Sequence, residues 1–403
     1  MAARYILPAL AVAGRAIAQS SSCSNSATTT IQNAGDASAL ARCSTYTGSI
    51  AIATGTTDSI ALNGIQDITG SLVANNVTSM SQLSGDSLTT IGDSFSLNGL
   101  TILTSLNFPR LAQVGTVDWV ALPQLQGLSF TTGLQQAGSV TIVNTQLNTL
   151  SGINLQTVDS MQITNNPYLN AINMQLGNVT QALVIQANGR NVSVTFPNLI
   201  WAYNITLANA SSVSIPSLSA VNGSLGFYSD YFSSISAPNL TSVGGSLSIV
   251  ANPNLNSVDM PELKTVGGGF TVANNTQLMT INDFGALQTV GGALNLNGAL
   301  TNVSLPAISD VRGAFNLTST GDVSAACSTF RGLSGMNNVI KGTYTCNSGA
   351  SRSGSGSSSA SGSATASSGS SSSSATHSSP ANVIYISGAT GVMGVVAAIF
   401  GML

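Results

Sequence analysis

Apolar residues recur through the middle of the chain in a fixed pattern about ten positions long. The clearest copy runs from Leu240 to Ile249 and reads L-T-S-V-G-G-S-L-S-I. Two further clear copies begin at Leu263 and Leu287. The last two apolar residues of each copy are two positions apart, which places both on one face of a β-strand. Each repeat is therefore predicted to contain a short strand, a turn and a second short strand.

Weaker copies of the pattern extend this regularity over most of the chain. They begin at Ile65, Leu88, Leu111, Leu134, Leu155, Leu176, Leu199, Leu218 and Ile308. The starts are about 22 residues apart, a period typical of leucine-rich repeats. One coil cannot bury its apolar face alone, whereas stacked coils bury a continuous core. We therefore predict a mainly β, leucine-rich-repeat-like, right-handed β-solenoid of about 12 coils over residues 65–325, with at most one short helix near Asp36–Arg42.

Glycine and proline punctuate the repeats. A glycine pair follows the valine of each clear copy, as at Gly244 and Gly245. Because glycine tolerates positive φ, we expect this pair to form a tight corner. Prolines such as Pro238 and Pro261 recur before the leucine that starts a copy. Proline cannot donate to a strand ladder, so it is also expected at a corner.

The amino-acid composition limits the classes of partner that the protein could bind. Only 6% of the residues are charged and the formal net charge is −3. The chain therefore has no basic surface suited to nucleic acid. Residues 1–18 combine Arg4, a short apolar run and a small-residue cleavage pattern, which is typical of a secretory signal peptide. A secreted surface with so few charges needs another source of solubility, and glycans would supply it.

The C-terminal residues are read as a stalk and an attachment signal. Residues 347–380 are rich in Ser and Gly and are predicted to form a disordered stalk. Residues 381–403 form an apolar tail with no basic residue after it, which favours a GPI-attachment signal that is removed. Ser374 is the candidate attachment residue, with Ser373 next. The alternative is a plain membrane span.

Four cysteines flank the repeats, at Cys23, Cys43, Cys327 and Cys346. They allow three disulfide connectivities, and pairing within each end fits best. Such disulfides would staple an N-terminal cap over residues 19–64 and a C-terminal cap over residues 326–346, because the end coils of a solenoid expose an apolar cross-section. No CxxC spacing occurs, so we expect no metal and no cofactor.

Ten Asn-x-Ser/Thr sequons predict extensive N-glycosylation. They lie at Asn76, Asn178, Asn191, Asn204, Asn209, Asn222, Asn239, Asn274, Asn302 and Asn316. None falls between residues 77 and 177, which we call the bare stretch. This stretch is the candidate partner-facing surface, although chance spacing in an Asn-rich chain would also produce the gap.

Few residues offer catalytic chemistry. His377 is the only histidine and lies in the stalk, which argues against a Ser-His-Asp triad. The carboxylates of Asp259, Glu262 and Asp283 are the one candidate set for a polysaccharide lyase or hydrolase. The simpler interpretation is that these three carboxylates lie at a solvent-exposed coil corner.

Aromatic residues lie on both sides of Asp230 in the sequence. Tyr228, Asp230 and Tyr231 are candidate sugar contacts, because rings beside a carboxylate can stack on a sugar and hydrogen-bond to it. The alternative is a core cluster with one or two surface tyrosines. Trp119 and Trp201 fall near strand positions and are expected to pack in the core.

Together, the signal peptide, Gly-Gly repeats, flanking cysteines, Ser-rich stalk and GPI signal resemble the fungal GPI-anchored cell-wall organisation proteins, which are related to sporulation-specific wall proteins. The repeats, clearest at Leu240, Leu263 and Leu287, are similar to the receptor L-domain. The resemblance implies a glycoprotein of the outer membrane leaflet and cell wall that is required for wall integrity. It supplies no catalytic residues. We therefore expect a non-enzymatic binding or structural solenoid.

The expected partners are wall polysaccharide or wall glycoproteins, together with the membrane through the anchor. Neither nucleic acid nor a small-molecule substrate is expected. Two alternatives remain, a wall-polysaccharide-modifying β-helix enzyme and an adhesion or spore-wall structural component.

Overall fold

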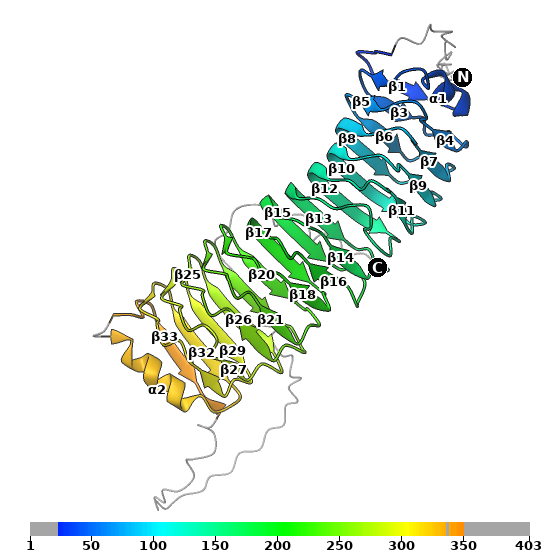
Figure 1. The fold of residues 1–403 in the computed structure, drawn as a ribbon. Helices are drawn as coiled ribbons and strands as arrows, with labels where there is room; N and C mark the ends of the chain where they lie inside the picture. The colour runs from blue at the N-terminus through cyan, green and yellow to red at the C-terminus, as the bar shows by residue number, and fades with distance from the viewer. Residues whose placement is uncertain (1–22, 336–337, 350–403) are drawn as a thin grey trace, which may run out of the picture. The chain divides into compact units, whose positions relative to one another are not determined.

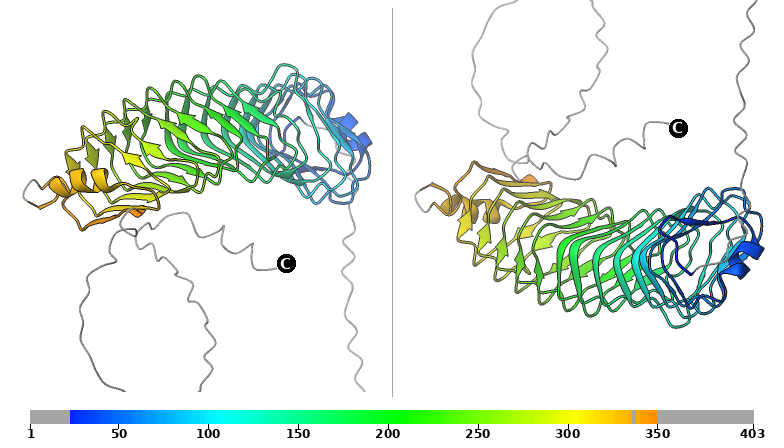
Figure 2. Two further views of the ribbon diagram at one scale, coloured as in Figure 1. Left: turned by 90° about the horizontal axis from the view of Figure 1, so that it is seen from below. Right: turned by 90° about the horizontal axis from the view of Figure 1, so that it is seen from above.

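The computed structural model describes residues 23–335 and 338–349. The predicted signal peptide, the candidate attachment residue Ser374, the apolar tail and nearly all of the predicted stalk lie outside this part of the chain. Within it, short strands follow one another around successive coils, and the coils stack along one axis (Figures 1 and 2). The predicted mainly β solenoid is confirmed.

One large parallel sheet of 22 strands runs the length of the stack. Its strands are β1 (Thr29–Ile31), β2 (Thr45–Tyr46), β3 (Ile50–Ile52), β5 (Asp67–Ile68), β6 (Leu72–Asn75), β8 (Thr90–Asn98), β10 (Gln113–Leu122), β12 (Gln136–Thr145), β13 (Thr157–Thr164), β15 (Asn178–Gln186), β17 (Trp201–Ala208), β19 (Ala220–Val221), β20 (Leu225–Tyr228), β22 (Ser242–Val243), β23 (Leu247–Val250), β25 (Thr265–Val266), β26 (Phe270–Asn275), β28 (Thr289–Val290), β29 (Leu294–Gly298), β31 (Asp310–Val311), β32 (Phe315–Ser319) and β33 (Tyr344–Asn347).

Smaller parallel sheets form where the chain returns across each coil. Their strands are β4 (Ile60–Ala61), β7 (Gln82–Ser84), β9 (Ser105–Asn107) and β11 (Leu128–Ser129); β14 (Ala171–Asn173), β16 (Ser193–Thr195) and β18 (Ser212–Ser214); β21 (Ser234–Ser236) and β24 (Ser257–Asp259); and β27 (Thr280–Ile281) and β30 (Asn302–Val303).

The strand register follows the sequence repeat. Leu225, Leu247 and Phe270 are paired in successive strands, and all three are buried. Phe227 pairs with Ile249 and is also buried, as expected. The ladder extends beyond the twelve predicted starts, because β1 pairs with β3 near the N-terminus and β33 pairs with β32 at the other end. Residues predicted as caps therefore also contribute coils.

The glycine pairs lie at a bend between short strands, such as β22 and β23, as predicted, but positive φ is not the reason. Gly244 and Gly267 are not among the glycines with positive φ, so they do not form a left-handed corner. They lie instead where neighbouring coils approach closely. A Cβ on Gly267 would lie 2.1 Å from the carbonyl oxygen of Gly244, and one on Gly291 would lie 2.0 Å from that of Gly267. Only glycine permits this stacking.

A ladder of buried polar side chains runs inside the coils. Asn166 accepts from the backbone N–H of Thr145 at 3.1 Å and donates to the carbonyl of Ile142 at 3.1 Å. Asn188 repeats this arrangement one coil later, since it accepts from Asn166 and donates to the carbonyl of Ile163. Such side chains satisfy backbone groups that the curved coil would otherwise leave unpaired in the core.

Helices and disulfides close the ends of the described region. Helix α1 (Ala34–Ala39) lies where a short helix was predicted, and begins two residues earlier because Asn33 caps it by accepting from the N–H of Asp36. Helix α2 (Ser324–Gly332) was not predicted; it buries Ala326 and Phe330 at the last coil. The disulfides join Cys23 to Cys43 and Cys327 to Cys346, which confirms the local pairing.

Candidate functional site

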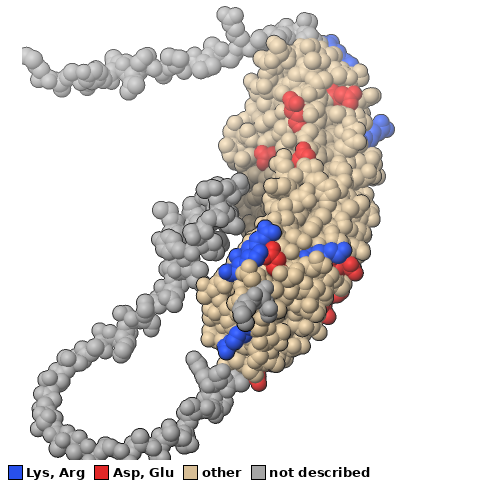
Figure 3. Space-filling model, turned by 90° about the vertical axis from the view of Figure 1, so that its left-hand side faces the viewer, with Lys and Arg blue, Asp and Glu red and all other residues tan. Residues whose placement is uncertain are grey.

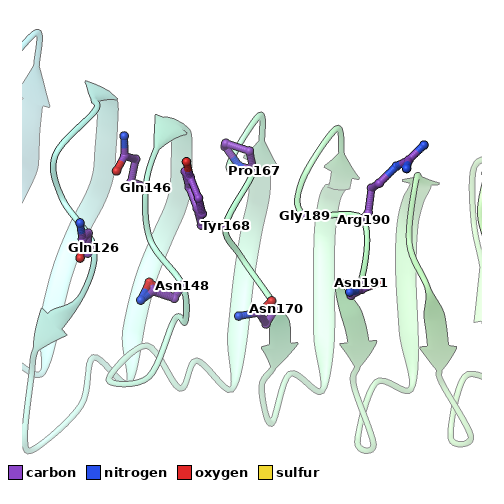
Figure 4. Close-up of a pocket in the computed structure, with 9 residues that line it drawn as sticks. All are labelled: Gln126, Gln146, Asn148, Pro167, Tyr168, Asn170, Gly189, Arg190 and Asn191. Atoms are coloured by element: carbon purple, nitrogen blue, oxygen red, sulfur yellow. The ribbon is translucent and has the colours of Figure 1, made fainter.

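A hollow of about 710 Å³ crosses four successive coils on their corner side. Its lining residues are Gln126, Gln146, Asn148, Pro167, Tyr168, Asn170, Gly189, Arg190 and Asn191. We call it the amide groove. Gln126, Asn148, Asn170 and Asn191 lie in one row across the coils, and the other side chains lie above them (Figure 4).

The repeat itself generates the row of amides. The backbone N–H of Asn148 donates to the carbonyl of Gln126 at 3.1 Å, and that of Asn170 donates to the carbonyl of Asn148 at 3.1 Å. Equivalent positions of successive coils therefore present a side-chain amide at each strand spacing, about 4.8 Å. The repeated amides form a periodic line of donors and acceptors along the solenoid.

A tight turn holds Tyr168 at the rim of the groove. Asn165 adopts φ of 55°, a left-handed conformation that asparagine tolerates, and the next residue, Asn166, turns into the buried ladder. The chain then emerges at Pro167, and the Tyr168 ring stays 59% exposed. An exposed ring on a fixed turn offers a flat apolar face next to hydrogen-bonding amides.

The groove carries little charge. Arg190 is its only charged lining residue, and its guanidinium lies 5.9 Å from the ring centre of Tyr231, two coils further on. Most of the face seen in Figure 3 is likewise neither acidic nor basic. The groove is thus suited to neutral, hydroxyl-rich ligands rather than to phosphates or nucleic acid.

A second, shallower hollow of about 420 Å³ lies over the glycine row of the large sheet. Gly92, Gly115 and Gly138 line it, together with Gln113 and Gln136. The absence of side chains at the glycines creates the depression. All of its lining residues belong to the bare stretch.

None of the ten sequon asparagines is buried. The side chains of Asn76, Asn178, Asn191, Asn204, Asn209, Asn222, Asn239, Asn274, Asn302 and Asn316 are exposed or half-exposed. Asn316 faces outward between buried Phe315 and Leu317, as expected. Asn191 begins a sequon and also lines the amide groove. The groove therefore overlaps the bare stretch but extends beyond its end at residue 177.

The three candidate carboxylates lie on two successive coils, with Asp259 at the end of β24 and Asp283 one coil further on. Asp259 accepts a hydrogen bond from the Ser236 hydroxyl at 3.0 Å, while Glu262 and Asp283 are exposed. Within residues 23–335 and 338–349, no three His, Cys, Asp or Glu side chains gather closely enough to hold a metal ion. None of the three carboxylates lines the amide groove.

The sugar contact predicted around Asp230 is wrong for that residue. Asp230 has no exposed surface, because it occupies the buried polar ladder and accepts from the N–H of Ala210 at 2.7 Å. Tyr228 and Tyr231 are half-exposed and remain candidate sugar contacts.

The two tryptophans differ from each other in burial. Trp119 is buried among Phe95, Phe108 and Phe130, as predicted, with ring centres 5.7 Å from Phe95 and 5.9 Å from Phe130. Trp201 is only half-buried at the start of β17, contrary to the prediction.

The residues of the amide groove were not predicted from the sequence. The available signal was a run of Asn and Gln at the outward corners, one per coil. It was hidden by the general abundance of Asn in the chain.

A family model and several curated relatives match the chain. A family model described as Ecm33, GPI-anchored cell wall organization protein, matches residues 1–41. Protein ecm33 of Aspergillus fumigatus is 40% identical over 347 residues, which cover 86% of this chain and 85% of the relative. A cell surface GPI-anchored protein of Arthroderma benhamiae is 40% identical over 344 residues, which cover 85% of this chain and 87% of the relative. The cell surface GPI-anchored protein ECM33 of Candida albicans is 32% identical over 357 residues, which cover 87% of this chain and 86% of the relative.

The chain belongs to the Ecm33 family. Membership confirms the resemblance seen in the sequence, and with it a role in cell-wall organisation and a location at the cell surface as a GPI-anchored protein of the wall. No solved structure matches the chain. Within the described residues, no helix has the length and hydrophobicity to span a membrane.

Proposed function

We propose that this Ecm33-family protein organises the wall without catalysing a reaction, by binding a neutral wall polysaccharide, or the glycans of a wall glycoprotein, in the amide groove. The observation that carries the proposal is the groove itself. It combines a periodic line of amides with one exposed aromatic ring and a single charged residue. Amides and an aromatic face supply the hydrogen bonds and apolar contact that fix a sugar's orientation.

The repeat spacing supports a polymer rather than a small ligand. Gln126, Asn148 and Asn170 recur once per coil, so a bound chain with repeating units would meet similar partners at successive units. Many weak, equivalent contacts would then add along the polymer. The groove is also open at its surface, which suits a chain that continues beyond it.

The arrangement of carboxylates supports a non-catalytic role. Glycoside hydrolysis requires two carboxyl groups that flank the scissile bond. Asp259 is engaged by Ser236, and Glu262 and Asp283 lie exposed outside the groove.

The test uses the full-length protein, produced in a fungal host and released from its anchor. It is incubated with insoluble β-glucan, chitin or mannan, and both the retained protein and the released reducing ends are measured. We expect retention on at least one polymer without release. If reducing ends are released and Glu262→Gln abolishes that release, the protein is an enzyme and the proposal is wrong. If no polymer retains the protein, polysaccharide binding is contradicted.

A further inference from the structure

Trp201 lies at a strand edge where the neighbouring coils carry small or polar residues. Its registered partners are Asn178 in β15 and Ala220 in β19. Ala202 points into the core, so Trp201 and Tyr203 on either side of it face outward. Tyr203 is 49% exposed and the preceding Ile200 is 54% exposed. One coil thus presents two exposed large side chains, Ile200 and Tyr203, beside the half-buried Trp201, and such a patch is typical of a binding surface.

A predicted glycan acceptor lies directly beside this patch. Asn178 begins a sequon that Thr180 completes, and its side chain is half-exposed. Registered residues of neighbouring parallel strands point to the same side and lie about 4.8 Å apart, so Asn178 and Trp201 share one outer edge. On the other side of Trp201 the registered partner is the small residue Ala220.

The sequon asparagine Asn204, in the same strand as the patch, is less well placed for it. The Oδ1 atom of Asn204 accepts from the N–H of Ser224 at 2.8 Å, which holds that amide against the next coil. By contrast, the Asn178 side chain makes no hydrogen bond within the part of the chain that the structure describes. Its amide is therefore free to carry a sugar without loss of a structural contact.

We propose that Trp201 and Tyr203 form a platform for the N-linked glycan of Asn178, with its first N-acetylglucosamine packed against the indole ring. The apolar C–H face of the sugar covers the ring, and the polar groups of the sugar remain in water. The patch is then covered by the chain's own modification, and the first sugar becomes a structural part of the β15–β17 edge.

The test measures hydrogen exchange in β17 of the full-length glycoprotein, together with the occupancy of Asn178 by mass spectrometry. Asn178→Gln is combined with Trp201→Ala in a double-mutant cycle. We expect Asn178→Gln to raise exchange in β17 by roughly two- to ten-fold, the factor that an aromatic stacking contact supplies. In the Trp201→Ala background the same change is expected to have no further effect.

Two comparisons keep the test decisive. Asn302→Gln removes an exposed sequon in β30, opposite Thr280, and should leave exchange in β17 unchanged. Enzymatic trimming of the wild-type protein to one N-acetylglucosamine should keep the protection, whereas complete removal should abolish it, and neither step depends on a variant folding. An unmodified Asn178, or an equal effect of Asn178→Gln in both Trp201 backgrounds, would overturn the proposal and leave the patch as a surface for a protein partner.

Discussion

Asp230 and Asn252 occupy the same buried position in successive coils, but only Asn252 donates from its side chain to the preceding coil. The Nδ2 atom of Asn252 donates to the carbonyl of Phe227 at 3.3 Å. The Oδ2 atom of Asp230 is buried and has no hydrogen-bond partner. Because Leu207 is registered with Phe227, the carbonyl equivalent for Asp230 is that of Leu207. A protonated Asp230 can donate to it, and a carboxylate cannot.

Burial raises the pKa of Asp230 to about 7, although the N–H groups of Ala210 and Tyr228 partly oppose this shift. The folded protein therefore holds a proton on Asp230 between about pH 4 and pH 7, where the unfolded chain has released it. The contribution of this proton to stability is fully present below about pH 4 and is lost as the pH rises to about 7. We expect the free energy of unfolding to fall by roughly 2–4 kcal/mol across this window on account of Asp230.

Asp230→Asn is the matched variant for this prediction. It restores the donor found at Asn252, so it should stabilise the protein at pH 7 and remove this component of the pH dependence. Denaturant unfolding of both proteins from pH 4 to pH 8 measures the difference. Parallel stability curves for wild type and Asp230→Asn would contradict the assignment of a neutral Asp230.

The stacked glycines predict a sharp contrast between two alanine substitutions. In Gly267→Ala the new Cβ would lie 2.1 Å from the carbonyl oxygen of Gly244, so the coils must separate. We expect a loss of about 1–3 kcal/mol or more. Gly285→Ala meets no atom within 4 Å and has no positive φ, so it should be neutral or slightly stabilising. Thermal unfolding of the two variants measures the contrast, and equal Tm values would show that the glycine row is not needed for close stacking.

The disulfide at each end should act locally. Each coil contacts its neighbours in a solenoid, so the loss of a staple affects the end coils first. Replacing Cys327 and Cys346 by Ser removes the link between α2 and β33, and should cost about 3 kcal/mol. Hydrogen exchange should accelerate in β33 while the central strand β17 stays protected. Uniform acceleration along the whole stack would instead indicate one cooperative unit.

Much of the fold was predictable because the repeat is a local pattern with a global consequence. The spacing of Leu247 and Ile249 placed both in the core, and the period gave the stacking of coils. The local disulfides followed from the position of the cysteines at the two ends. Helix α2 was missed because nine residues are too few for the spacing of Ala326 and Phe330 to stand out in the sequence, and its stability depends on docking Phe330 against the last coil.

Other features depend on contacts between coils, which no single repeat displays. The need for Gly267 arises from a backbone atom 23 residues earlier, at Gly244. Asp230 was interpreted as a surface group because its neighbours are aromatic, whereas the register with Asn252 places it in the buried ladder. The amide groove likewise exists only once Asn148 and Asn170 are stacked. The bare stretch was predicted from the spacing of the sequons, but the hollow over its glycine row and the amide groove, which extends beyond it to Asn191, were not.

The most direct test of the account compares retention of matched variants on the wall polymer that holds the wild-type protein. Tyr168→Ala combined with Asn170→Ala removes the exposed ring and one amide of the groove. Met279→Ala is the control, because Met279 is 53% exposed and does not line the groove. We predict that the groove variant loses roughly ten-fold or more in affinity while the control binds as wild type. Unchanged retention of the groove variant would contradict the claim that this protein organises the wall through the amide groove.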